Sequence, residues 1–227
     1  MHNETFIISL GGSRIMPNEI DVEFLKAFRD LILNEVEKGK KFAVVCGGGA
    51  LARQYIESAK ELGQNNEDEL DWVGIASTRL NAELVRVIFG DSAYEKIILD
   101  PDILPSTEKA ILVGGGWKPG NSSDLASVHV ARSLGANKLI NLSNIDYVYD
   151  KDPRKFSDAQ KIEKISWADF RKLLPPGWSA GLSSPFDPVA AKEGEALGLE
   201  VAILNGNNID NLAKYLNGEE FIGTKIS

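Results

Sequence analysis

The stretch GGGWKPGNSSD, residues 114–124, decides the fold of this chain. It follows the apolar run 110–113 and precedes an amphipathic stretch, 125–134, whose helix Ser122 or Ser123 can cap. A strand, a glycine-rich loop and a helix in this order direct backbone N–H groups and the positive end of a helix at one point. This arrangement favours a phosphate or another small anion, whereas an ordinary βα connection needs fewer glycines.

The same arrangement occurs earlier in the chain. Residues 42–46 form an apolar run without polar alternation, as expected for a parallel strand covered on both faces, and the triple glycine 47–49 follows directly. A helical pattern then covers residues 50–62. A glycine pair, Gly11-Gly12, ends another apolar run, 6–10. Two triple-glycine loops in one chain strengthen the prediction of an anion site.

Strands and helices alternate along the whole chain. Apolar periodicity with glycine stops predicts helices over residues 22–38, 50–62, 70–89, 125–134, 166–174, 188–197 and 209–216. Apolar runs predict strands over residues 6–10, 42–46, 97–99, 110–113, 138–142 and 201–204, with a terminal strand within 221–226. The alternation predicts an α/β fold, a three-layer αβα sandwich with a mainly parallel central sheet, in a single domain of 227 residues.

Composition excludes several classes of protein. The formal net charge of −8 argues against a general nucleic-acid or membrane-surface binder. The single cysteine, Cys46, excludes an intrachain disulfide and a cysteine-cluster metal site, and we assign no metal ligands. No apolar run approaches membrane-spanning length, and the N-terminus lacks a signal-peptide pattern. We therefore expect a cytoplasmic protein.

The glycine-rich loops share one edge of the predicted sheet. In open parallel sheets, ligands bind at the carboxyl ends of the strands. Gly11-Gly12, residues 47–49, residues 114–124 and the loop 144–152 all begin at such ends. They can converge on one crevice with room for two substrates whose phosphates face each other, which is the layout of phosphoryl transfer.

Six motifs, in order, resemble the amino acid kinase family. They are LGGS (10–13), GGGALARQYI (47–56), DWVGIASTRLNA (71–82), GGWKPGNSSD (115–124), NIDYVYDKDP (144–153) and SSPFDPVAAK (183–192). Within this family the chain looks most like the archaeal-type uridylate (UMP) kinases, over residues 9 to about 224. The resemblance implies a carbamate kinase-like αβα fold, Mg²⁺-ATP as phosphoryl donor, UMP as acceptor with UDP as product, and a homo-oligomer, hexameric in this branch.

The resemblance also implies roles for individual residues. The catalytic candidates are Arg53, which would neutralise charge, Asp187, which would organise cations around the phosphates, and Arg14. The residues implied to contact ATP, with Arg53, are Gly11, Gly12, Ser13, Gly48, Ser143, Asn144, Tyr149 and Asp152. The residues implied to contact UMP are Gly47, Asp71, Trp117, Lys118, Pro119, Gly120, Asn121, Ser122 and Ser123. The acceptor would thus be bound by residues 1–135 and ATP by residues 136–227.

Two positions depart from the common family pattern. Many members carry a lysine where this chain has Ser9, and Arg14 is the nearest cation, with Lys118 and Lys192 as other candidates. Many uridylate kinases have His or Gln followed by Thr where this chain has residues 121–123, Asn-Ser-Ser. Serine keeps the hydroxyl that binds phosphate. We expect acceptor specificity to be decided at Trp117, Asn121 and Ser122.

Structural interpretations of these residues stay open. Arg53 could be a surface arginine, and Trp117 could simply pack at a strand end. Asp71 and Arg79 could form a salt bridge on a helix face or an oligomer contact. Asp187 could be only a helix N-cap. The basic run 151–155 is typical of a solvated face, and His129 of a structural helix residue.

Other functions within the fold also stay open. An isopentenyl phosphate kinase has a histidine that reaches the acceptor phosphate, whereas the helix after residues 47–49 offers Arg53 and no histidine. A carboxylate acceptor, as in acetylglutamate kinase, fits less well. The family also includes a molybdenum and tungsten storage protein that binds oxoanions and ATP without making a nucleotide. The absence of a lysine at Ser9 leaves room for that alternative.

Overall fold

The computed structural model describes residues 4–176 and 184–227. Its centre is a seven-stranded sheet in the order β3-β2-β1-β4-β8-β9-β7, and among the described strands only the β8–β9 pair of this sheet is antiparallel. The predicted mainly parallel sheet is confirmed. Its strands are β1 (Thr5–Leu10), β2 (Lys41–Cys46), β3 (Ile111–Gly114), β4 (Lys138–Ser143), β7 (Lys164–Ile165), β8 (Glu200–Asn205) and β9 (Thr224–Ile226).

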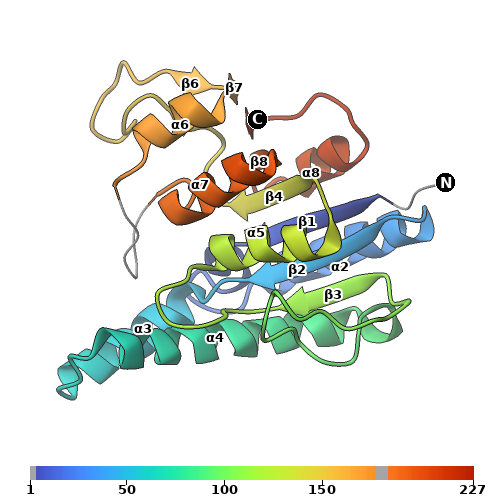
Figure 1. Ribbon diagram of the computed structural model, residues 1–227, viewed down its shortest axis with the longest axis horizontal. Coiled ribbons are helices and arrows are strands. Elements are labelled where there is room, and N and C mark those ends of the chain that lie inside the picture. Colours follow the sequence, from blue (N-terminus) through green and yellow to red (C-terminus); the bar gives the residue numbers. More distant parts are fainter. Residues whose placement is uncertain (1–3, 177–183) are drawn as a thin grey trace.

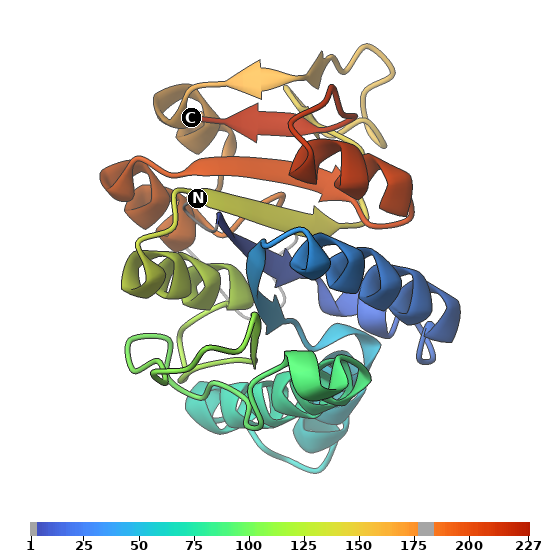
Figure 2. The same ribbon diagram turned by 90° about the vertical axis from the view of Figure 1, so that its right-hand side faces the viewer.

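Helices cover both faces of this sheet, so the predicted three-layer αβα sandwich is confirmed. Helices α2, α4 and α8 pack on one face and α5, α6 and α7 on the other, and Figure 2 shows α2 and α5 on opposite sides of the strands. Helix α3 lies beside α4, away from the sheet (Figure 1). The helices are α1 (Gly12–Ile15), α2 (Val22–Glu37), α3 (Gly49–Glu61), α4 (Glu67–Ile88), α5 (Ser123–Leu134), α6 (Trp167–Leu173), α7 (Pro188–Leu197) and α8 (Ile209–Leu216), with a 3₁₀ turn at Gly90–Ser92.

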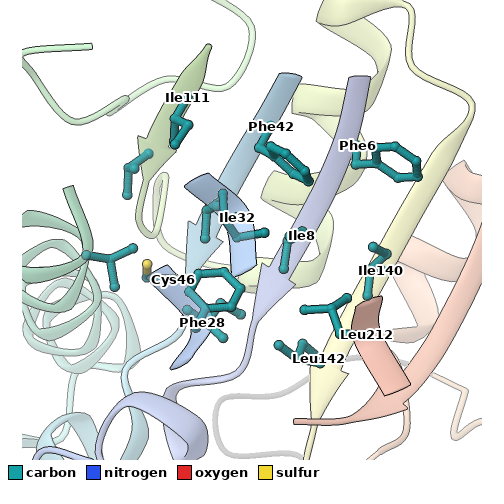
Figure 3. Packing of buried hydrophobic residues seen from close by; sticks show 14 of the residues in the cluster. Phe6, Ile8, Phe28, Ile32, Phe42, Cys46, Ile111, Ile140, Leu142 and Leu212 are labelled. Atoms are coloured by element: carbon teal, nitrogen blue, oxygen red, sulfur yellow. The ribbon is translucent and has the colours of Figure 1, made fainter. Parts of the chain in front are cut away.

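The two faces of β1 have different partners. Ile8 packs with Phe28 of α2 in one core (Figure 3), whereas Ile7 belongs to the second core, which contains α5. Because side chains alternate along a strand, Ser9 shares the face of Ile7 and points to the α5 layer. This alternation places a hydroxyl in an otherwise apolar strand next to the first turn of α5.

Two sequence-based boundaries were wrong. Residues 97–99 do not form a strand: only Ile98 bridges to Gly114, because a turn at Asp100, whose carboxylate accepts the Asp102 N–H at 2.9 Å, leads the chain away from the sheet. Helix α4 begins at Glu67 rather than at residue 70. The Asn66 side chain caps it, and acidic residues in its first turn are favoured by the helix dipole.

The remaining elements differ from prediction in small ways. Helix α1 and the hairpin of β5 (Val148–Tyr149) with β6 (Lys161–Ile162) were not predicted, because each is too short to show a period. Helices α7 and α8 begin and end at the predicted residues. In residues 4–176 and 184–227 no helix combines the length and apolar character needed to cross a membrane.

Candidate active site

The strand order of the sheet reverses between β1 and β4. From β1 the chain continues outward through β2 and β3, whereas from β4 it continues in the other direction through β8. A ligand crevice in such a sheet opens at the carboxyl ends of the strands at this reversal. Ser9 on β1 and Asn141 on β4 are register partners there. Their side chains therefore mark the floor of the expected crevice.

The carboxylate of Asp124 lies above this pair. Ser9 Oγ and Asn141 Nδ2 donate to its Oδ1 at 2.8 and 2.9 Å, and the Asp187 N–H donates to its Oδ2 at 3.1 Å. Asp124 is the second residue of α5, and the side chain of Ser122 caps that helix. Strands β1 and β4 and the start of α7 thus hold one carboxylate at the reversal point.

The electrostatics of Asp124 favour a cation. Desolvation raises the pKa of Asp124 to about 6; the hydrogen bonds from Ser9 and Asp187 oppose that rise, and the negative charge of Asp187 adds to it. At neutral pH the carboxylate is ionised. Ser9 supplies a hydrogen bond but no charge, so the neighbouring carboxylates of Asp124 and Asp187 lie at the strand reversal without a lysine at this strand position.

Asp187 has a second function in the fold. Its Oδ1 accepts the N–H groups of Val189 and Ala190 at 2.6 and 2.8 Å, so it is the N-cap of α7. Pro188 at the first helical position supports the same start. The cap and a charge near reacting phosphates are compatible. The cation-organising function of Asp187 stays a prediction.

The loops after β1, β2 and β4 meet, as their sequence positions predict. A Cβ on Gly12 would lie 2.0 Å from Gly49 N, and one on Gly11 would lie 3.1 Å from the carbonyl oxygen of Leu142. Only glycine allows this approach at Gly12. Ser13 follows in the short helix α1.

Two buried side-chain atoms have no hydrogen-bond partner among the described residues: Oγ of Ser143, a predicted ATP contact, and Nε of Arg14, a catalytic candidate. Gly206 lies between these residues, because its N–H donates to Ser143 O at 2.8 Å and a Cβ on it would lie 2.9 Å from the Arg14 side chain. The Arg14 guanidinium pairs with Asp21 at 3.3 Å and lies over Phe24, toward α2. The structure therefore does not bring the charge of Arg14 to the glycine loops in this conformation.

The other predicted ATP contacts follow β4. Asn144 is exposed directly after the strand, and Tyr149 is half-buried in β5. Asp152 accepts hydrogen bonds from Arg154 N–H and Nε at 3.0 and 3.1 Å, and these bonds hold the pKa of Asp152 below its usual value. Lys151 is paired with Asp158, so two members of the basic run 151–155 are neutralised within the loop.

Helix α4 meets the predicted acceptor loop. Asp71 Oδ2 accepts the Gly120 N–H at 2.8 Å. Arg79 donates to the carbonyl oxygens of Gly116 and Trp117, so it does not form the alternative salt bridge with Asp71. Two of the predicted acceptor residues, Asp71 and Gly120, are therefore brought together.

The side chains of the acceptor loop make local contacts. The Trp117 ring lies 4.8 Å from the His129 ring, and Lys118 Nζ lies 3.9 Å from the centre of the Trp117 ring. Asn121 Nδ2 donates to the carbonyl oxygen of Pro119 at 2.9 Å, which closes the turn. Trp117 thus packs at a strand end, and as a half-buried residue it also keeps part of its ring open.

Arg53 lies on the first turns of α3. Its side chain is exposed and forms no ion pair within the described part of the chain, and its charge-neutralising role stays a prediction. Gly47 N–H donates to Leu10 O at 2.9 Å, and Gly48 is the N-cap of α3. Ser183, the first residue of the sixth motif, lies outside the described residues.

Sequence reasoning missed several residues that the structure places at the site. It assigned no role to Asp124, Asn141, Thr78 or Asn81. Two signals were present: Asn141 interrupts an apolar strand, and Asn81 interrupts the buried face of a helix. Buried polar residues at such positions need partners, and here Asn141 binds the Asp124 carboxylate of α5 while Asn81 binds the glycine loop after β2.

Comparisons with known proteins agree with this geometry. A family model described as the amino acid kinase family matches residues 4–205. The chain belongs to the amino acid kinase family. The uridylate kinases of Methanobrevibacter smithii and Methanothermobacter thermautotrophicus are each 36% identical to this amino acid kinase, over 223 and 225 residues that cover 97% of both chains.

Solved structures give the same result for the fold of this amino acid kinase. The crystal structure of uridylate kinase from Archaeoglobus fulgidus matches it with a TM-score of 0.83 and 34% identity, over 98% of this chain and 99% of that one. The UMP kinase from Bacillus anthracis has a TM-score of 0.79 over 99% of this chain and 96% of its own, and at 20% identity it supports the fold alone.

Proposed function

We propose that this chain is a uridylate kinase, which transfers the γ-phosphoryl group of ATP to UMP and releases UDP and ADP. The observation that carries the proposal is the meeting of two glycine loops, after β1 and β2, beside the carboxylate of Asp124 at the strand reversal. Its full-length relatives at about 36% identity are uridylate kinases, which favours UMP as the acceptor.

The proposed reaction needs positioning and charge neutralisation rather than covalent help from the protein. An oxygen of the UMP phosphate attacks the γ-phosphorus of ATP. A new P–O bond forms while the bond to the β–γ bridging oxygen breaks, and ADP leaves with that electron pair. The attacking phosphate is already an anion near neutral pH, so no general base is required.

ATP fits the side of the crevice formed by β4, β8 and α1. Ser143 Oγ there is buried and lacks a partner among the described residues, and a bound nucleotide would supply one. Mg²⁺ would accompany ATP, and the carboxylate oxygens of Asp124 and Asp187 are donors of the type that Mg²⁺ prefers. Held by these residues, the ion would neutralise charge on the reacting phosphates.

UMP fits the side formed by α4 and residues 114–124. We assign the acceptor to residues 1–135 and ATP to residues 136–227, with Gly11–Ser13 and Gly48 at the boundary between the two. An isopentenyl phosphate acceptor is disfavoured, because both ring nitrogens of His129 already contact carboxylates, Asp102 at 3.0 Å and Glu193 at 3.1 Å. The other histidine, His2, lies outside the described residues.

A homo-oligomer, hexameric as in the branch it resembles, would explain the surface of α3 and α4. Ala50 is the only residue of α3 that the fold buries among the 13 of that helix. Leu62, Tyr55 and Leu80 are 89%, 60% and 63% exposed. Apolar surface of this kind marks an interface, and we infer that a second copy covers it. Light scattering on the wild type and on Leu80→Asp checks this, since the variant should dissociate.

Initial rates of ADP formation test the reaction, with UMP, CMP, isopentenyl phosphate and N-acetylglutamate as acceptors. We expect the highest kcat/KM with UMP, in the cytoplasmic setting where both nucleotides are available. A preference for another acceptor would reassign the substrate. No turnover with any acceptor, together with tight binding of molybdate, would replace the kinase by an oxoanion-binding protein.

A further inference from the structure

Arg79 of α4 binds carbonyl oxygens of the acceptor loop, residues 114–124. Its Nε donates to Gly116 O at 3.2 Å and its Nη2 donates to Trp117 O at 2.9 Å, while the guanidinium also lies 5.8 Å from the centre of the Trp72 ring. A planar guanidinium can bind two successive carbonyl groups at fixed spacing, which an ammonium cannot do. Arg79 therefore fixes two consecutive peptide groups of the loop.

Thr78 fixes the preceding peptide group in the same loop, which joins Gly115 to Gly116. Its Oγ1 accepts the Gly116 N–H at 2.6 Å and donates to Ile75 O at 2.7 Å. A Cβ on Gly115 or Gly116 would lie 3.0 or 2.9 Å from this hydroxyl oxygen. These two glycines are thus required by close contact with α4, which gives the triple glycine a structural reason besides anion binding.

Asn81, on the next turn of α4, holds the other glycine loop. Its Nδ2 donates to Gly47 O at 2.8 Å and to Gly48 O at 3.2 Å. The side chain is buried at 3% exposure, so its amide has been taken from water for these contacts. One helix therefore contacts the backbone of both loops that follow β2 and β3.

Because the peptide group is planar, these carbonyl contacts determine where the N–H groups of the same peptide groups point. In a trans peptide the C=O of one residue and the N–H of the next point in opposite directions. Carbonyls of Gly47 and Gly116 that point to α4 therefore direct the N–H groups of Gly48 and Trp117 away from α4. Neither of these two N–H groups has an acceptor among the described residues.

We infer that Thr78, Arg79 and Asn81 are positioning residues for both glycine loops. Arg79 and Asn81 hold loop carbonyl groups against α4 and Thr78 holds the Gly116 N–H, so that the loops present the N–H groups of Gly48 and Trp117 to the anionic acceptor. The inference rests on the proposed function for the identity of the acceptor. In this inference, α4 fixes the shape of the acceptor site, in addition to the sugar contact implied for its residue Asp71.

Arg79→Met removes both hydrogen bonds while keeping most of the apolar stem. We expect the KM for UMP to rise about tenfold or more, which corresponds to the loss of one or two such bonds, with the KM for ATP changed less than about twofold. Arg79→Lys should recover part of the loss, because it keeps the charge but not the fork. Arg86→Met is the matched control, since Arg86 pairs with Glu83 on the same helix at 2.7 Å and contacts neither loop.

Hydrogen exchange of residues 111–124 gives a readout that does not need activity. Exchange in this segment should be faster in Arg79→Met and in Thr78→Val than in the wild type and Arg86→Met, at unchanged thermal stability of the remaining fold. Unchanged exchange, or equal increases in the KM values for UMP and ATP, would overturn the inference. If the wild type forms no UDP, the proposed function fails, and the exchange data still decide the role of α4.

Discussion

The proposed acceptor side and the proposed donor side differ in how far protein side chains fix them. The Gly48 and Trp117 N–H groups have no acceptor among the described residues, but the loops that carry them are held by side chains of α4. On the acceptor side, protein side chains already bind the loop backbone: Arg79 binds Gly116 and Trp117, and Asp71 binds Gly120. On the proposed donor side, Ser143 Oγ is a buried side-chain atom without a partner among the described residues.

With the proposed assignment of the two sides, this difference predicts two modes of binding. A loop that is fixed before the ligand arrives loses little entropy on binding and selects its ligand by shape. A side with unsatisfied polar groups is completed by the ligand itself. We therefore expect UMP to be selected by a preformed site and ATP to order its own surroundings.

The largest expected effect concerns Asp187, which we propose organises the cation between the two substrates. Asp187→Asn should lower kcat by about a hundredfold, the loss typical for one charge-stabilising group, with little change in the KM for UMP. Asparagine is as good an N-cap as aspartate, so α7 keeps its start and stability is preserved. Steady-state kinetics and thermal melts measure both. Weakened UMP binding with kcat intact would refute the assignment.

A pair of aromatic substitutions tests the separation of the two sides. Trp117→Ala should raise the KM for UMP by about tenfold, and Tyr149→Ala should raise the KM for ATP by a similar factor, each from the loss of stacking or packing area. Each variant serves as the control for the other. If either substitution raises the KM values for UMP and ATP equally, the two residues do not belong to separate substrate sites.

Ser9→Ala tests the hydrogen bond between Ser9 and Asp124 at the strand reversal. Removing the hydroxyl takes one of three donors from the Asp124 carboxylate, and its pKa should rise further above the ordinary range. We expect kcat at pH 7 to fall by about threefold to tenfold and to recover at higher pH. A pH profile of kcat identical to that of the wild type would show that Ser9 does not act through Asp124.

The smallest effect on activity is expected far from the crevice. Glu35 of α2 is buried and binds Lys38 and Lys40; burial raises its pKa, but the two lysines outweigh that effect and hold it below the usual value. A lowered pKa in the folded state means that Glu35 stabilises the fold at neutral pH. This contribution is lost as the pH falls from about 5 through the lowered pKa.

Glu35→Gln should therefore cost about 1–3 kcal/mol of unfolding free energy at pH 7, and its stability should decline less below pH 5. Urea unfolding at a series of pH values measures this. The kcat and KM values should match the wild type at temperatures where both are folded. A pH dependence of stability unchanged by the substitution would contradict the role of the Glu35 ion pairs.

Much of the fold could be predicted from the sequence because parallel strands are continuous apolar runs. Residues 42–46 and 138–142 needed no tertiary information, and the starts of α7 and α8 followed from their Asp and Asn caps. The failure at residues 97–99 has a physical cause. Three apolar residues are too few to distinguish a paired strand from a single bridge beside a turn.

The candidate site was only partly predictable. Motif order identified the glycine loops, Asp71 and Asp187, but the partners of Asp124 come from strands far apart in the chain, at Ser9 and Asn141. The contacts of Arg79 and Asn81 depend on how α4 lies against two loops. Packing of this kind carries no local sequence period, so no pattern in one sequence could reveal it.

Hydrogen exchange on the free wild-type enzyme, and on its complexes with UMP or a non-hydrolysable ATP analogue, tests the comparison most directly. We predict that the N–H groups of Gly116 and Gly120, hydrogen-bonded to Thr78 and Asp71, are protected before any ligand is added. Residues 143–152 should gain protection only with the ATP analogue. Rapid exchange of residues 114–120 in the free enzyme, slowed only by UMP, would contradict a preformed acceptor site.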